Sequence, residues 1–154
     1  MFNTLVKELG SAIGLDDLAP DETSAVTLAI DGVAFSLQYY DEGEEIYIIH
    51  RIASLPYDAQ AQAAVQRYLL ESNCFFRAVG PGVLGIEANE IFYTVRVACR
   101  DKSDQCLSGN ELEHILRSVV DACSELRNGC SQIVESTQSY ATTDELDFHS
   151  MLRV

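Results

Sequence analysis

The histidines are the first residues of this sequence to consider for chemistry. His50, His114 and His149 lie far apart in the sequence, whereas a general base needs a partner that positions it. His50 falls inside a predicted strand, where packing or hydrogen bonding is the favoured role, and His114 falls on the polar side of a predicted helix. The histidines therefore do not predict a catalytic centre.

Other nucleophile and phosphate-binding motifs are also absent from the sequence. No serine or cysteine stands in a pattern such as GxSxG. The glycines Gly80, Gly82 and Gly85 are not followed by the Lys-Ser or Lys-Thr pair of a phosphate loop. We therefore expect neither an enzyme nor a bound cofactor.

The five cysteines are scattered, at Cys74, Cys99, Cys106, Cys123 and Cys130. An odd number without CxxC spacing predicts free thiols rather than a disulfide framework, a zinc site or a redox pair. Cys99 and Cys123 fall on predicted core faces, where a free cysteine packs as a small hydrophobic residue. We expect all five thiols to be reduced and dispensable.

An acidic cluster occupies residues 41–45, with the sequence DEGEE. It lacks the alternating ligand spacing of a calcium loop, so a metal site is not expected. A solvated turn that discourages aggregation between strands is the favoured interpretation.

Composition and charge narrow the class of protein. The 154 residues suit one domain, and 24 acidic against 10 basic residues give a net charge of −14. Such a surface repels phosphate backbones and anionic lipids, so neither nucleic acid nor membrane is an expected partner. The N-terminus lacks the basic start and apolar stretch of a signal peptide, and no run approaches a membrane span, so we expect a cytoplasmic protein.

Hydrophobic periodicity predicts the first half of the fold. Apolar residues at helical spacing in 2–13 predict an amphipathic helix that ends at Gly14. Three strands follow, at 26–30, 33–40 and 46–52, with a hairpin turn at Asp31-Gly32. The third strand is apolar on both sides, as expected of a central strand or of one that meets a partner.

The second half contains two more helices and two strands. Asp58 is a predicted cap for a helix that continues to Asn73 and is apolar around much of its girth. A hairpin over 83–100 follows, and a capping box of Ser108 and Glu111 begins a last helix that is predicted to stop at 128–129. The expected fold class is α+β, an antiparallel sheet with helices in the order α-β-β-β-α-β-β-α. We expect one domain over 1–129 and a polar, flexible tail over 130–154.

This ordered set of motifs resembles the class I chaperones of bacterial type III secretion, as exemplified by the Tir chaperone. The matching features are LVKELGSAIGLDDL, the turn AIDG, LQYYDEGEEIYI, SLP, RYLLESN, GVLGIE and the leucine-rich last helix, which together span roughly residues 2 to 127. The resemblance implies a homodimer that binds the N-terminal segment of a secreted effector and keeps it extended and competent for secretion. The acidic hairpin would then belong to a scaffold, and the secretion ATPase would be a further candidate partner.

The resemblance also implies two sets of site residues. Effector contacts are expected on the first helix and the sheet, at Phe2, Leu5, Val6, Leu9, Ile13, Phe35, Leu37, Ile46 and Ile48. The dimer interface is expected on the second helix, at Ala61, Ala64, Val65, Tyr68 and Leu69. Two alternatives stay open: a regulatory adaptor of the same fold that binds a regulator of secretion-gene expression, and a small or thiol-dependent enzyme.

Overall fold

In the part of the chain that the structure describes, three helices cover one face of a five-stranded sheet. The elements are α1 (Phe2–Ile13), β1 (Ala25–Ile30), β2 (Val33–Tyr40), β3 (Glu45–Ser54), α2 (Ala59–Asn73), β4 (Gly82–Glu87), β5 (Glu90–Ala98) and α3 (Gly109–Met151). This computed structural model describes residues 1–74, 80–100 and 105–151, and for residues 138–151 it describes the backbone alone. The order of helices and strands confirms the α+β fold class that the sequence predicts.

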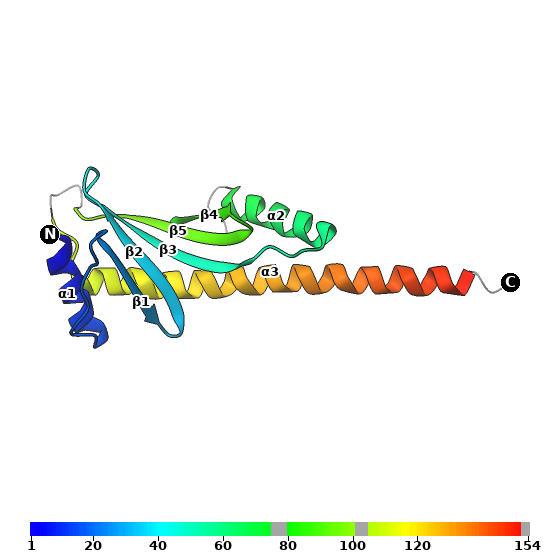
Figure 1. Ribbon diagram of the computed structural model, residues 1–154, viewed down its shortest axis with the longest axis horizontal. Coiled ribbons are helices and arrows are strands. Elements are labelled where there is room, and N and C mark those ends of the chain that lie inside the picture. Colours follow the sequence, from blue (N-terminus) through cyan, green and yellow to red (C-terminus); the bar gives the residue numbers. More distant parts are fainter. Residues whose placement is uncertain (75–79, 101–104, 152–154) are drawn as a thin grey trace.

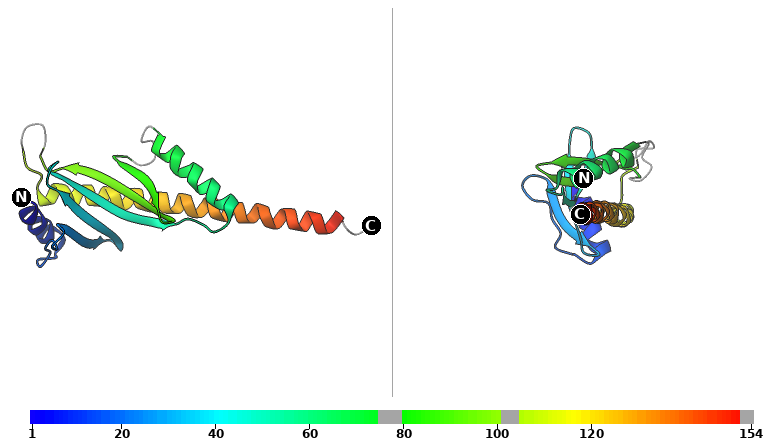
Figure 2. Two further views of the ribbon diagram at one scale, coloured as in Figure 1. Left: turned by 45° about the horizontal axis from the view of Figure 1, so that its top comes forward. Right: turned by 90° about the vertical axis from the view of Figure 1, so that its right-hand side faces the viewer.

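The sheet is antiparallel throughout, with the strand order β1-β2-β3-β5-β4. Strand β3 is therefore central, which explains why its sequence is apolar on both sides, and β1 and β4 are the edges. Figure 1 shows α3 running along the length of the sheet, with α1 near one end and α2 beside β4. In the end-on view of Figure 2 the strands curve around one side of α3.

Two hairpins close through turns in which two consecutive residues have positive φ. Between β1 and β2, Asp31 and Gly32 have φ angles of 51° and 79°. Between β4 and β5, Ala88 and Asn89 have φ angles of 48° and 65°. Such turns match the right-handed twist of the paired strands, so short local sequences set the registers of both hairpins.

The helix ends follow local side-chain signals. The Asp58 carboxylate accepts a hydrogen bond of 2.7 Å from the N–H of the third residue along, at the start of α2. At the start of α3, the Glu111 carboxylate accepts bonds of 2.9 Å from the N–H and 2.7 Å from the hydroxyl of Ser108. Helix α1 ends at Gly14, which is left-handed with φ 77°.

Helix α3 contributes a continuous row of side chains to the hydrophobic core. One stripe along it is almost completely buried, at Leu112, Leu116, Val119, Cys123, Leu126 and Cys130. These side chains join the buried residues of α1 and of the sheet in one hydrophobic cluster. Among the described residues, no helix is both long and apolar enough to cross a membrane.

The prediction that the last helix stops at 128–129 is wrong, because α3 continues to Met151. A Cβ at Gly129 would lie 2.3 Å from the Tyr68 hydroxyl oxygen, so this glycine allows α3 to approach α2 and does not end the helix. Beyond it Cys130 is buried, and Ile133 and Val134 pack against the core, which supports continued helix. Packing by distant residues has overridden the local stop signal.

Substituting Gly109 with alanine is expected to loosen the contact between α1 and α3. A Cβ at this position would lie 2.5 Å from backbone atoms of Glu8 and Leu9, which cannot move aside as a flexible side chain can. We expect Gly109→Ala to lower the free energy of unfolding in urea by roughly 1–3 kcal/mol. Asn110→Ala, at the exposed next position of α3, is the control, and we expect a change below about 0.5 kcal/mol. Equal losses in the two variants would contradict the close approach of α1 to α3.

Candidate partner-binding surfaces

The cysteines are placed as packing residues. The structure pairs none of the five with another, and Cys99, Cys123 and Cys130 are buried whereas Cys74 and Cys106 are exposed. Burial raises the pKa of the Cys123 thiol to about 12, and burial also raises the pKa values of Cys99 and Cys130. Because the thiolate is the nucleophilic form, these three thiols are poor candidates for reactive groups.

His50 ties α3 to the sheet, as the sequence analysis predicts for a hydrogen-bonded residue. Its Nδ1 lies 2.7 Å from the carbonyl oxygen of Ala34, and its Nε2 lies 3.0 Å from a guanidinium nitrogen of Arg127. The same guanidinium donates to the carbonyl oxygen of Ile52 at 3.2 Å. Since arginine only donates, Nε2 is the acceptor and Nδ1 carries the proton, which makes the ring neutral. His114 is exposed on α3, and the side chain of His149 lies outside the described residues.

Acid is expected to weaken the fold through His50. Burial lowers the pKa of His50 below the ordinary 6.5. The hydrogen bond to Ala34 opposes this shift, and the positive charge of Arg127 adds to it. The unfolded chain therefore takes up this proton first as pH falls below 6.5, so the stabilisation is full above that pH and is lost below it.

Urea unfolding at about pH 7.5 and about pH 5.5 measures this loss. We expect His50→Gln to lose less stability across that interval than the parent chain, because glutamine does not titrate. His114→Gln, at an exposed position on α3, is the matched control and should follow the parent. A parent-like loss in His50→Gln would contradict the assignment.

The acidic cluster is tied to the sheet by arginines of the neighbouring hairpin. Glu45 lies 2.8 Å from Arg96, and Glu44 lies 3.1 Å from Arg100. Among the described residues, no group of three or more histidine, cysteine or acidic side chains is arranged to hold a metal ion. Exposed ion pairs of this kind contribute little to stability.

The structure brings the predicted effector-contact residues together, on the face of the sheet that the helices cover. All are buried except the partly buried Ile13: Phe2, Leu5, Val6, Leu9, Phe35, Leu37, Ile46 and Ile48. Phe2 stacks on Tyr39 with ring centroids 5.0 Å apart, which shows how α1 closes over β2. Because the protomer already buries these side chains, an effector could contact only the small part of their surface that stays exposed. The binding role of this set stays a prediction.

Among the described elements, no helix lies over the opposite face of the sheet, and sequence reasoning missed this face. Ile49 and Phe92 are partly buried on this open face, and Val83 is 50% exposed. Thr94 pairs with both Ile49 and Val83, so one row of the open face runs across β3, β5 and β4. The signal was the second apolar side of β3, but the sequence does not say which side the helices leave open.

The predicted dimer residues of α2 lie on its inward side. Ala61, Val65 and Leu69 are buried within the protomer, and Ala64 and Tyr68 are partly buried. The apolar surface that α2 exposes is instead Leu70, which is 72% exposed, near Ile86 of β4, which is 44% exposed. Together with Leu69 and Leu84 they line a shallow hollow of about 290 Å³, which we call the α2–β4 surface. The dimer interface itself stays a prediction.

Comparisons with known proteins agree with this architecture. The sequence pattern of the Tir chaperone protein (CesT) family matches residues 4–127. A comparison with curated proteins gives no match to the chain.

Solved structures share the fold at low sequence identity. The Yersinia pestis type III secretion chaperone SycH, in complex with a stable fragment of YscM2, matches with a TM-score of 0.59 and 20% identity, covering 82% of this chain and 99% of that chain. The HopA1–SchA chaperone–effector complex matches with a TM-score of 0.65 and 17% identity, covering 82% and 93%. The ExoU–SpcU complex from the type III secretion system of Pseudomonas aeruginosa matches with a TM-score of 0.52 and 18% identity, covering 88% and 96%.

Proposed function

Since this chain belongs to the Tir chaperone protein (CesT) family and is therefore a type III secretion chaperone rather than an enzyme, we propose that it binds the N-terminal segment of a secreted effector. In this proposal the segment stays extended along the chaperone in the bacterial cytoplasm, which keeps it competent for secretion. The chaperone needs no cofactor, because masking apolar side chains is a matter of contact and not of bond chemistry.

The open face of the sheet is the observation that carries this proposal. Ile49, Phe92 and Val83 present apolar side chains there, on three adjacent strands and without a covering helix. The edge strands of the sheet are β1 and β4. On β4 the backbone N–H and carbonyl of Leu84 are already hydrogen-bonded to the Asn73 side chain, so β1 is the edge where an extended chain can add backbone hydrogen bonds. An extended segment can therefore combine backbone pairing at an edge with apolar anchors on the face.

The energetics require several such anchors. Burying one leucine or isoleucine side chain contributes roughly 1.5–3 kcal/mol, and ordering a disordered segment opposes binding. The net charge of −14 makes a basic or apolar segment the better partner than an acidic one. Affinity should depend strongly on apolar contacts and weakly on salt.

We also propose that the chaperone is a homodimer formed through the α2–β4 surface. Leu70 and Ile86 are large apolar side chains that the protomer leaves exposed beside the edge strand β4. A second copy would cover both side chains. The buried residues of α2 that the sequence singles out would support this surface from beneath.

Effector binding is tested on the open face itself. A pull-down from the native cytoplasm identifies the partner, and calorimetry then measures the affinity of its N-terminal fragment. We expect Phe92→Ala and Ile49→Ala each to weaken binding roughly tenfold, as partial loss of one anchor predicts. Ser124→Ala, at an exposed position of α3 away from the sheet, is the matched control and should bind like the parent.

Two results would contradict this assignment. Parent-like affinity in both open-face variants, with circular dichroism showing a native fold, would place the effector elsewhere. Capture of a regulator of gene expression that is never secreted would favour the adaptor function instead.

A further inference from the structure

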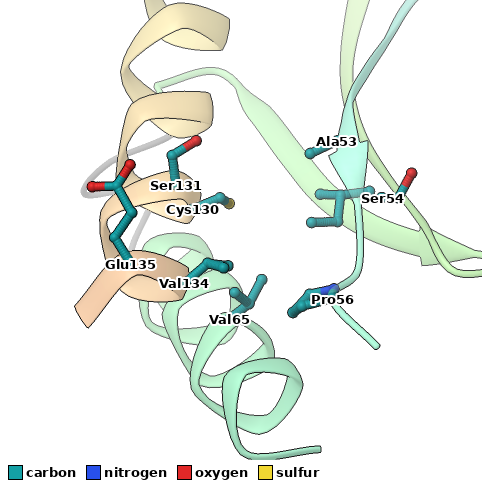
Figure 3. Close-up of a pocket in the computed structure, with 9 residues that line it drawn as sticks. Ala53, Ser54, Pro56, Val65, Cys130, Ser131, Val134 and Glu135 are labelled. Atoms are coloured by element: carbon teal, nitrogen blue, oxygen red, sulfur yellow. The ribbon is translucent and has the colours of Figure 1, made fainter. Parts of the chain in front are cut away.

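A hollow beside the extended part of α3 has no role in the proposed function described so far. It has a volume of about 290 Å³ and lies between α3, α2 and the end of β3. Figure 3 shows Cys130 and Val134 of α3 facing Val65 of α2 and Pro56 across it. The remaining lining residues are Ala53, Ser54, Ile91, Ser131 and Glu135.

One wall of this hollow lies beyond the family pattern. The pattern ends at residue 127, whereas Cys130, Ser131, Val134 and Glu135 all come later in the chain. The SycH and SchA structures cover 82% of this chain while 99% and 93% of their own chains are matched. The continuation of α3 past Gly129 therefore builds a surface in addition to the shared fold.

The size and walls of the hollow favour a side chain over a small molecule. Sites for cofactors and drug-sized ligands usually enclose roughly 300–1,000 Å³, so this hollow is at the lower limit and suits one or two side chains. Its interior is apolar at Val65, Ile91 and Val134, which suits an aliphatic group. A partner segment would reach it more readily than an isolated metabolite.

A second, more polar hollow of about 350 Å³ adjoins the first and shares Ser54 and Pro56 with it. The fully exposed ring of Tyr57 stands beside it, and Asn89 and Glu90 line its far side. The two hollows together form a track that crosses the loop between β3 and α2. An extended peptide could place one side chain in the apolar hollow and its neighbours over the polar one.

Charge selects among such peptides. The two lining acids are Glu135 in the apolar hollow and Glu90 in the polar one, and neither lining includes a lysine or arginine. Hydrogen bonding to Arg51 lowers the pKa of Glu90, and the same arginine already balances the charge of that carboxylate, so Glu135 is the lining acid left to attract a cation. With a net charge of −14 on the chain, basic residues on the peptide are favoured.

We propose that this track is an additional subsite for the partner protein, which takes a leucine or isoleucine flanked by lysine or arginine in an extended segment. This inference rests on the proposed function, because it assigns the segment to the effector. The aliphatic side chain occupies the hollow lined by Val65 and Val134, and a basic neighbour lies near Glu135. The extension of α3 would thus add a sequence preference that the shared fold lacks.

A synthetic peptide, acetyl-Gly-Ser-Lys-Leu-Arg-Ser-Gly-amide, tests the subsite without the effector. Titrated into the ¹⁵N-labelled full chain, it should give saturable chemical-shift changes centred on Ala53, Ile91 and Val134. Replacing its leucine by alanine should weaken binding roughly tenfold, the loss expected when a partly buried leucine side chain is removed. Replacing its two basic residues by glutamate should abolish the saturable chemical-shift changes.

Matched variants locate the binding on the chain. Val134→Asp should abolish the shifts, whereas Gln132→Asp, at an exposed neighbouring position of α3, should not. Glu135→Lys should weaken binding, whereas Glu125→Lys, another exposed acid on α3, should leave it unchanged. Glu135→Lys also keeps the test decisive if Val134→Asp fails to fold.

The outcomes separate this inference from the proposed function. An effector fragment that binds equally to the parent and to Glu135→Lys, with no peptide shifts at the track, overturns the inference and leaves the function intact. Saturable shifts at the track together with weaker effector binding by Glu135→Lys, but not by Glu125→Lys, support it. Shifts confined to the open face would also overturn it.

Discussion

Leu70→Asp is expected to convert the proposed dimer into a folded monomer. Leu70 is 72% exposed in the protomer, so the change leaves the core intact, but in the proposed dimer it buries a carboxylate. A two-fold axis repeats the change on both copies, and each uncompensated charge costs several kcal/mol. We expect the dimer dissociation constant to rise at least about a thousandfold, which corresponds to about 4 kcal/mol. Light scattering across a micromolar concentration series measures it.

Two further variants separate the interface from the fold. Leu15→Asp, a change of the same type at a partly exposed leucine near α1, should stay dimeric. Val65→Asp places the charge at a side chain that is only 1% exposed, so it should lower the free energy of unfolding instead. A parent chain that is monomeric at micromolar concentration would refute the dimer.

Ending the chain after Asn128 is expected to destabilise the domain by about 3 kcal/mol. This truncation removes Cys130, which is 5% exposed, together with Ile133 and Val134, which pack against the core. One fully buried and two partly buried apolar side chains account for that amount at roughly 1.5–3 kcal/mol for each complete burial. The midpoint and slope of urea unfolding measure the loss.

The companion truncation after Ser139 keeps all of these contacts. We expect its stability to lie within about 0.5 kcal/mol of the full chain, because the residues it removes are those that the sequence predicts to be a polar tail. If both truncated chains are as stable as the full chain, the result supports the predicted domain limit at residue 129. If both lose a large and equal amount of stability, the residues after Ser139 contribute to folding.

Local signals explain why so much of the fold could be predicted. The Asp31-Gly32 turn, the Asp58 cap and the Ser108–Glu111 capping box all depend on residues adjacent in the sequence. The alternation of apolar and polar residues along β2 and the apolar stripe along α3 similarly predict which side chains share a face. Such signals set the type, order and approximate ends of the elements.

The wrong prediction, the end of the last helix, arose where contacts between distant residues compete with local preference. Gly129 has the sequence context of a helix stop, but its lack of a side chain serves the approach of Tyr68 from α2. The predicted effector contacts Ile46 and Ile48 lie on the covered face and stay a prediction, while their neighbour Ile49 lies on the open face. The predicted dimer residues of α2 lie inward and also stay a prediction, while Leu70 is the side chain left exposed.

The sequence by itself determined the fold class, the order of its helices and strands, and the resemblance to secretion chaperones. These properties follow from hydrophobic periodicity, turn residues and the order of motifs, all of which depend on residues close together in the sequence. Only the tertiary structure decided which face of the sheet is covered, which side of α2 is free, and that α3 extends past Gly129 to line a hollow with α2 and β3. A strand such as β3 with two apolar faces, or a helix apolar around its girth, is compatible with either orientation. The orientation of each element is decided by the other elements that pack against it, and these contacts join residues far apart in the sequence.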